Sequence, residues 1–135
     1  MLLELKRTHG ALLSCLDELE RATLDAAPDR ASLANIRWKL SKASAERRKQ
    51  VDAACDYLSL NSANSIDRSR VVALRADNAE GVAASSSHVR RWSMEQVLAD
   101  WDGYREASAA LRKAMRARIL QEQRALYPLL ERAAA

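Results

Sequence analysis

The fold follows from a stretch near the N-terminus, residues 2–19, which reads LLELKRTHGALLSCLDEL. Its apolar residues recur at alternating spacings of three and four, and one histidine falls in the same series: Leu2, Leu5, His9, Leu12, Leu16 and Leu19. Such spacing puts these residues on one face of an α-helix, as a narrow apolar seam. We therefore predict a first helix from about Leu2 to Ala26, ended by Pro28 and Asp29.

The rest of the chain predicts three more helices. We expect the second over about residues 30–60, a polar turn at 61–65, and the third over about 66–91. The fourth is expected from Ser93 onward. Because short connections make neighbouring helices antiparallel, the predicted fold is all-α: an up-down-up-down antiparallel four-helix bundle in a single domain, residues 1–135.

Local signals refine the expected helix ends. Asp29 or Ser32 can cap the second helix, and Ser93 with Gln96 has the spacing of a capping box. We expect Pro128 to kink or end the last helix, because proline lacks the amide hydrogen. The low helical propensity of glycine allows a break in the third helix near residues 77–81.

The composition is that of a folded helical protein. Of the 135 residues, 48% are hydrophobic and 30% are charged, which argues against a disordered chain. With 3 glycines and 2 prolines, the chain has few residues for the many turns of an all-β fold. No apolar run approaches the roughly 20 residues of a membrane span. Charged residues appear within the first seven positions, at Glu4, Lys6 and Arg7, so the N-terminus lacks the apolar core of a signal peptide. We therefore expect a cytoplasmic protein.

The charge balance does not point to nucleic acid. The formal net charge is +4, but basic and acidic residues alternate along every predicted helix. No helix-turn-helix geometry, zinc motif or aromatic stacking platform is visible. We therefore expect neither nucleic-acid nor membrane binding, and consider a homodimer or another protein as the partner.

Each predicted helix carries polar residues on its inward stripe, where an ordinary core would be apolar. They are His9 in the first helix, Arg48 and Asp52 in the second, Asp77 or Asn78 in the third, and Arg118 and Glu122 in the fourth. Residues four apart share a helix face, so each arginine and its acid point the same way. Folding the chain at the predicted turns places His9 opposite Arg48, and Arg48 opposite Asp77. We predict a polar cluster of these residues in the core.

Two segments of the chain share a pattern of polar and aromatic residues. Residues 48–57 and 118–127 both begin with arginine, place an acid four residues later, and end with tyrosine. The stretches HVRRW (88–92), ADWDGY (99–104) and RILQEQRALYPLL (118–130) extend the comparison. In these features the chain resembles the hemerythrin-like, or HHE cation-binding, family. That family is a four-helix bundle with a di-iron site between its helices.

The resemblance implies a degenerate metal site. His9 matches the family's first-helix histidine, and Asp52 and Glu122 match its two carboxylates. Arginines, Arg48 and Arg118, stand at two positions that the family fills with histidine. A guanidinium stays protonated and cannot act as an ordinary ligand, so most of the iron ligands are missing.

The leading hypothesis is a protein that is not an enzyme and has no cofactor. A buried network of arginines and acids would replace the di-iron site of a structural, regulatory or interaction module. Such a network stabilises a fold only where its members are well hydrogen-bonded. No Ser/His/Asp or Cys/His arrangement for catalysis can be placed on the predicted helices.

Two alternatives remain. In the first, His9, Asp52 and Glu122 hold a metal such as iron, and the arginines point outward; oxygen or redox sensing would be the role. In the second, the arginines bind a small anionic ligand in the bundle core, since a guanidinium suits carboxylates and similar groups. Asp52 and Glu122 would then compete with the ligand for the arginines.

Overall fold

The computed structural model describes residues 1–134; Ala135, the last residue of the predicted domain, lies outside the described residues. The described chain is all-α, as predicted, and contains no strand. Its five helices are α1 (Leu2–Ala22), α2 (Arg30–Asn61), α3 (Ser65–Arg91), α4 (Met94–Ala99) and α5 (Trp101–Ala134). None of these helices is long and apolar enough to cross a membrane.

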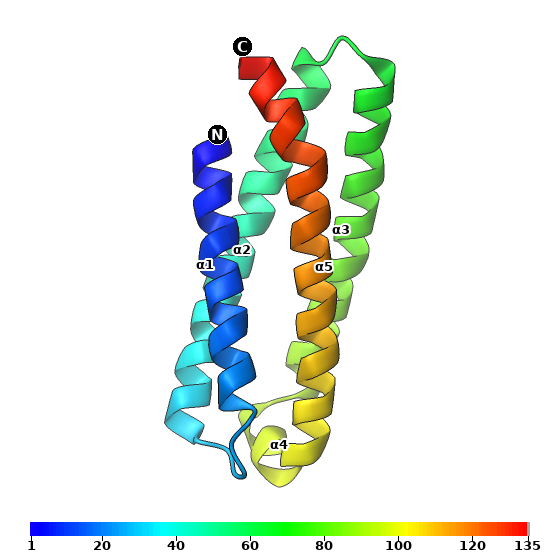
Figure 1. The fold of residues 1–135 in the computed structure, drawn as a ribbon. Helices are drawn as coiled ribbons and strands as arrows, with labels where there is room; N and C mark the ends of the chain where they lie inside the picture. Colours follow the sequence, from blue (N-terminus) through cyan, green and yellow to red (C-terminus); the bar gives the residue numbers. More distant parts are fainter. Residues whose placement is uncertain (135) are drawn as a thin grey trace.

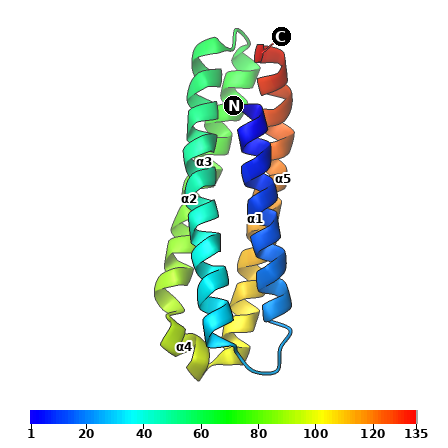
Figure 2. The same ribbon diagram turned by 90° about the vertical axis from the view of Figure 1, so that its left-hand side faces the viewer.

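Four long helices lie side by side and alternate in direction (Figure 1). α1 and α3 each contact both α2 and α5, and α2 also contacts α5. The short α4 lies at the end opposite the two chain termini, where it links α3 to α5 (Figure 2). This arrangement brings side chains from all four long helices to the same height.

Two of the predicted caps are present. The Asp29 carboxylate accepts a hydrogen bond from the Ser32 amide at 3.2 Å, at the start of α2. The Ser93 hydroxyl accepts one from the Gln96 amide at 3.2 Å, at the start of α4. Each satisfies a backbone donor that the first turn of a helix leaves free.

The first helix is shorter than predicted. It ends at Ala22 rather than near Ala26, and Thr23 turns the chain with its hydroxyl donating to the Glu20 carbonyl at 2.8 Å. The loop that follows is fixed from α5, because the indole of Trp101 donates to the Asp25 carbonyl at 3.0 Å. This tertiary contact is absent from any local sequence signal.

The second half of the chain decides three points that the sequence left open or placed differently. α3 runs unbroken through residues 77–81. The predicted fourth helix is two helices, since the backbone of Asp100 (φ −141°, ψ 75°) is not helical and its carboxylate caps α5 by accepting from the Gly103 amide at 3.0 Å. α5 continues through Pro128 to Ala134, so the proline does not end this helix. Because Pro128 has no amide hydrogen, the backbone carbonyl of Arg124 loses its helical hydrogen bond. Arg124 is exposed, so water can donate to this carbonyl instead.

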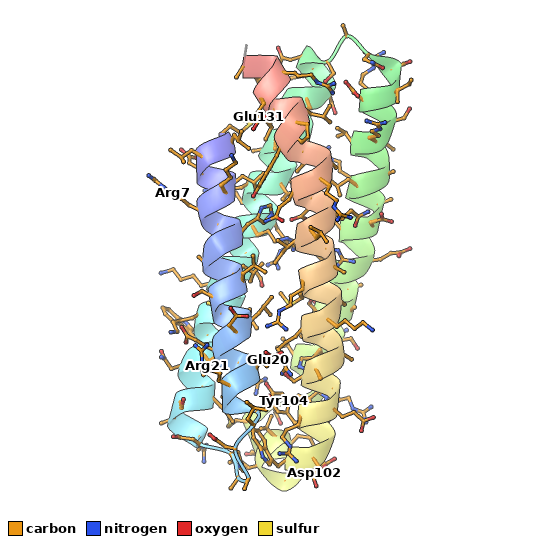
Figure 3. All side chains as sticks on the ribbon, viewed as in Figure 1. Arg7, Glu20, Arg21, Asp102, Tyr104 and Glu131 are labelled. Carbon is orange, nitrogen blue, oxygen red and sulfur yellow. The ribbon has the colours of Figure 1, made fainter. Side chains whose placement is uncertain are left out.

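The apolar core is divided into two clusters. One, in the half of the molecule that holds α4, includes Leu12, Leu16, Leu33, Leu40, Trp101, Tyr104, Met115 and Ile119. The other, in the half with the chain termini, includes Leu5, Val51, Cys55, Leu58, Val71, Leu74, Leu126 and Leu129. Figure 3 shows Tyr104 in the first of these halves, near the junction of α4 with α5. Between the two clusters lie buried polar residues of α1, α2 and α5.

Candidate functional site

Glu122 of α5 is the centre of the buried polar layer. Its side chain is fully buried. Both carboxylate oxygens accept hydrogen bonds from Arg47 of α2: Nε lies 2.9 Å from Oε1, and Nη2 lies 2.5 Å from Oε2. Oε1 also accepts from Nε2 of His9, on α1, at 2.8 Å. The carboxylate is therefore held by a two-pronged arginine contact and by an imidazole, the geometry that makes a buried charge tolerable.

The network reaches all four long helices. A neutral His9 that donates through Nε2 carries no proton on Nδ1, which can then accept from the Tyr127 hydroxyl 2.6 Å away. On the other side, Nη2 of Arg47 donates to the Asn78 side-chain carbonyl at 3.3 Å, which adds α3. We call His9, Arg47, Asn78, Glu122 and Tyr127 the polar network. It ties helices together at a level where apolar packing is interrupted.

The charges in this network favour an ionised Glu122. Burial alone would raise the pKa of this carboxyl, because a low-dielectric environment penalises the charged form. The hydrogen bonds from His9 and Arg47, together with the charge of Arg47, outweigh burial and hold the pKa below its usual value. Glu122 and Arg47 thus form a buried ion pair.

Arg47 takes the place predicted for Arg48, so the predicted position of Arg48 in the core cluster is wrong. Arg47 is buried, with 7% of its surface exposed, whereas Arg48 is half-buried and does not contact Glu122. A helix turns by about 100° per residue, so neighbours point in different directions. A strict seven-residue series from Leu33 identifies the buried face, since it leads through Leu40 and Arg47 to Ala54, all buried.

The two predicted acidic partners also lie elsewhere. Asp52 is exposed, so its predicted place in the core cluster is wrong. Asp77 accepts a hydrogen bond from Gln121 at 2.8 Å on the surface between α3 and α5, so it too is outside the network. Within residues 1–134, no three His, Cys, Asp or Glu side chains are close enough together to hold a metal ion. His9 and Glu122 meet, but Asp52 does not join them.

Arg118 does not pair with Glu122 either. It is half-buried, and its guanidinium lies against the backbone of α3 at Gly81. A Cβ at position 81 would be only 1.2 Å from Nη1 of Arg118. The glycine therefore opens the space that the guanidinium occupies. The buried residue on this side of α5 is Ile119, one position further along.

A second buried arginine was not predicted. Arg112 of α5 has 6% of its surface exposed and donates to the Ser108 hydroxyl at 2.7 Å. Its Nε is buried and has no hydrogen-bond partner in the described part of the chain. Burial lowers the pKa of this guanidinium, which an arginine tolerates because its pKa starts far above neutrality.

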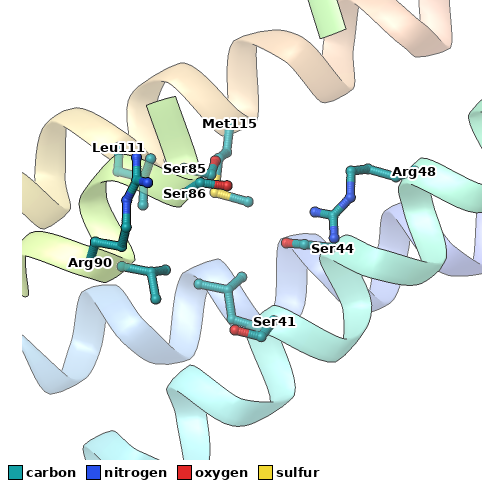
Figure 4. A pocket seen from close by; sticks show the side chains of 10 residues that line it. Ser41, Ser44, Arg48, Ser85, Ser86, Arg90, Leu111 and Met115 are labelled. Carbon is teal, nitrogen blue, oxygen red and sulfur yellow. The ribbon is translucent and has the colours of Figure 1, made fainter. Parts of the chain in front are cut away.

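Arg48 lines an open cleft between α2, α3 and α5. The cleft has a volume of about 370 Å³. Its walls are Leu40, Ser41, Ser44 and Arg48 from α2, Ser85, Ser86, Val89 and Arg90 from α3, and Leu111 and Met115 from α5. Figure 4 shows Arg48 and Arg90 toward opposite ends of the cleft, with serines from both helices between them. We call this hollow the arginine–serine cleft.

The charged residues that line the arginine–serine cleft are all positive. None of the described residues that line it is acidic. Among residues 1–134, Arg48 forms no ion pair with a carboxylate. A narrow extension of about 10 Å³, room for about one water molecule, leads inward from it to Arg47 and Arg118. The cleft thus combines positive charge, hydroxyl groups and an apolar floor.

Comparisons with protein-family models, curated proteins and solved structures gave no match to this chain. The likeness to the hemerythrin-like family therefore stays a prediction from the sequence. Two polar sites of the molecule bear on its function, the polar network and the arginine–serine cleft.

Proposed function

We propose that this chain is a non-catalytic, up-down-up-down four-helix bundle that binds a small anion, with a carboxylate as the expected ligand group. The ligand would occupy the arginine–serine cleft and pair with Arg48. The polar network lies deeper and would have a structural role: it would hold the four long helices in register, at the position that the hemerythrin-like resemblance gives to a di-iron site.

The observation that carries this proposal is that two adjacent arginines have different surroundings. Arg47 neutralises Glu122, whose remaining hydrogen bond comes from His9. Arg48 faces a cleft with no acidic lining residue among those described. The objection that Asp52 and Glu122 would compete with a ligand is removed, since Asp52 is exposed and Glu122 already has its partners.

The lining of the cleft suits a carboxylate. A guanidinium offers two parallel N–H groups that match the two oxygens of a carboxylate, and it keeps its charge at any physiological pH. The Ser44 and Ser85 hydroxyls on facing helices can each donate one further hydrogen bond. An exposed ion pair alone contributes little, so a ligand held only by its charged group would bind in roughly the millimolar range.

The test is a titration of the isotope-labelled protein with acetate, followed by backbone amide chemical shifts at constant ionic strength. We expect saturable shifts confined to residues around Ser44, Arg48 and Ser85. Arg48→Gln should abolish them. Arg7→Gln is the matched control, because it removes the same charge from an exposed site on α1 (Figure 3).

The possible outcomes separate the proposal from general attraction to a basic protein. Shifts lost in Arg48→Gln and kept in Arg7→Gln support a site in the cleft. Shifts scattered over the surface, equal shifts in both variants, or no saturable shift in the wild-type protein would overturn the proposal.

A further inference from the structure

The arginine–serine cleft continues along the groove between α2 and α3. A second hollow of about 360 Å³ adjoins it and shares four of its lining residues, Leu40, Ser41, Val89 and Leu111. Because the two hollows share these walls, they lie next to each other along α2 and α3, and together we call them the groove. Its ends on α2 are Ala34 and Arg48, about 21 Å apart at 1.5 Å of rise per residue.

The far half of the groove is mainly apolar. Beyond the four shared residues, its walls include Leu19, Trp38, Met94 and Tyr104. Trp38 keeps 61% of its surface exposed, unlike the buried Trp92 and Trp101. The Lys42 ammonium lies over the Trp38 ring, 5.2 Å from its centroid. A largely exposed aromatic side chain beside an apolar groove is a feature of ligand-binding surfaces.

The two basic groups in this far half are not free to bind a second anion in the same way. Arg37 donates to the backbone carbonyl of Trp92, and its guanidinium lies over the ring of Tyr104, 5.7 Å from the centroid. Burial, and then the charge of Arg37, lower the pKa of His88, so its imidazole is neutral at neutral pH. Among residues 1–134, Arg48 and Arg90 form no ion pair, and both line one half of the groove, whereas mainly apolar and aromatic side chains line the other.

We infer that the ligand of this groove is a monocarboxylate with an unbranched apolar chain, of the free fatty-acid type. The carboxylate pairs with Arg48, and the chain lies along Leu40, Val89 and Leu111 toward Trp38. This inference rests on the proposed anion site and adds the ligand class. The apolar chain supplies the affinity that a single exposed ion pair lacks.

The first experiment compares acetate, hexanoate, octanoate and decanoate, each below its micelle concentration, by calorimetry or by amide shifts where binding is weak. Each methylene that leaves water should tighten binding by up to about fourfold, so decanoate should bind far more tightly than acetate. Decanol has the same chain without the charge and should bind more weakly than decanoate. The fluorescence of Trp38 should change on binding, and Trp38→Phe should remove that signal.

The second experiment obstructs the path of the ligand's apolar chain. Ser41 is exposed and lines both halves of the groove, so Ser41→Phe should narrow the passage without disturbing the core. This variant should lose most of the preference for decanoate over acetate, measured as the ratio of the two affinities. Ser59→Phe is the control, since it makes the same change at an exposed position of α2 outside the groove.

The outcomes distinguish the two proposals. If acetate binds at Arg48 but affinity does not rise with chain length, the inference about the chain is wrong and the anion site stands. If decanol binds as tightly as decanoate, Arg48 does not hold the carboxylate and the inferred ligand class is wrong. If neither acetate nor decanoate binds, both proposals are wrong.

Discussion

His9 and Glu122 are 113 residues apart in the chain, and their side chains meet in the core with Nε2 of the imidazole 2.8 Å from Oε1 of the carboxylate. The contact joins α1 to α5, and Arg47 adds α2 through the same carboxylate. Every oxygen of Glu122 thus faces a donor from another helix. An ionised group so placed is stable only with all its partners, which makes this contact sensitive to single substitutions.

Arg47→Met should be strongly destabilising. It leaves Glu122 buried with His9 as its remaining partner, and removing one member of a buried pair costs about 3–5 kcal/mol. Glu122→Gln should also destabilise, because it leaves the Arg47 charge unpaired. The double variant should be less destabilised than the sum of the two, with a coupling of about 1–3 kcal/mol in denaturant unfolding.

A second double-mutant cycle, with Arg118→Met in place of Arg47→Met, is the matched control. Arg118 lies one turn from Glu122 on α5 but packs against Gly81 rather than against the carboxylate. Its coupling to Glu122→Gln should lie within about 0.5 kcal/mol of zero. A larger coupling for Arg118 than for Arg47 would contradict the assignment of the ion pair.

Acid should weaken the fold through Glu122. Because the folded-state pKa of this carboxyl is below its ordinary value, the unfolded chain binds the proton more readily. The stabilisation of the fold by the ionised Glu122 is complete above the pKa of this carboxyl in the unfolded chain. It is lost as the pH falls through the pKa of the carboxyl in the folded protein. The difference in unfolding free energy between wild type and Glu122→Gln should therefore shrink from pH 7 toward acid. A difference that stays constant or grows would show that the carboxylate is not the stabilised form.

The glycines of α1 and α3 should respond differently to alanine. A Cβ at Gly10 would meet no atom within 4 Å, so Gly10→Ala should stabilise the protein by about 1 kcal/mol through helix propensity. Gly81→Ala makes the same change but must displace the Arg118 guanidinium. It should therefore gain less than Gly10→Ala or destabilise, as thermal unfolding can measure. An equal gain at both positions would mean that Arg118 does not occupy the space over Gly81.

The first helix was predictable because its pattern is strict. From Leu5 to Leu19 the seven-residue spacing and the buried face agree, and His9 is buried in the predicted series. On α5, Glu122 is buried as predicted, but the arginine predicted one turn before it is not on the buried face. Ile119 is buried there instead of Arg118. A straight helix with 3.6 residues per turn drifts from a 3.5-residue pattern in this way.

The second helix was harder to predict. Arg47 and Arg48 are adjacent, both could be placed near the core, and the choice depends on a rotation of about 100°. The spacing of four from Arg48 to Asp52 suggested a pair, whereas the series through Leu33, Leu40 and Arg47 follows the buried face. A carboxylate held by an arginine on another helix leaves no local sequence signal. The arginine–serine cleft was likewise invisible, because it depends on how α2 and α3 sit over α5.

The central claim is that Arg47 is committed to Glu122 while Arg48 is available to a ligand. The most direct measurement follows the side-chain Nε–H signals of these two arginines by NMR during an acetate titration. The account predicts that the Arg48 signal shifts saturably and that the Arg47 signal stays unchanged and slow to exchange with water. A shift of the Arg47 signal, or an Arg48 signal indifferent to acetate, would contradict it.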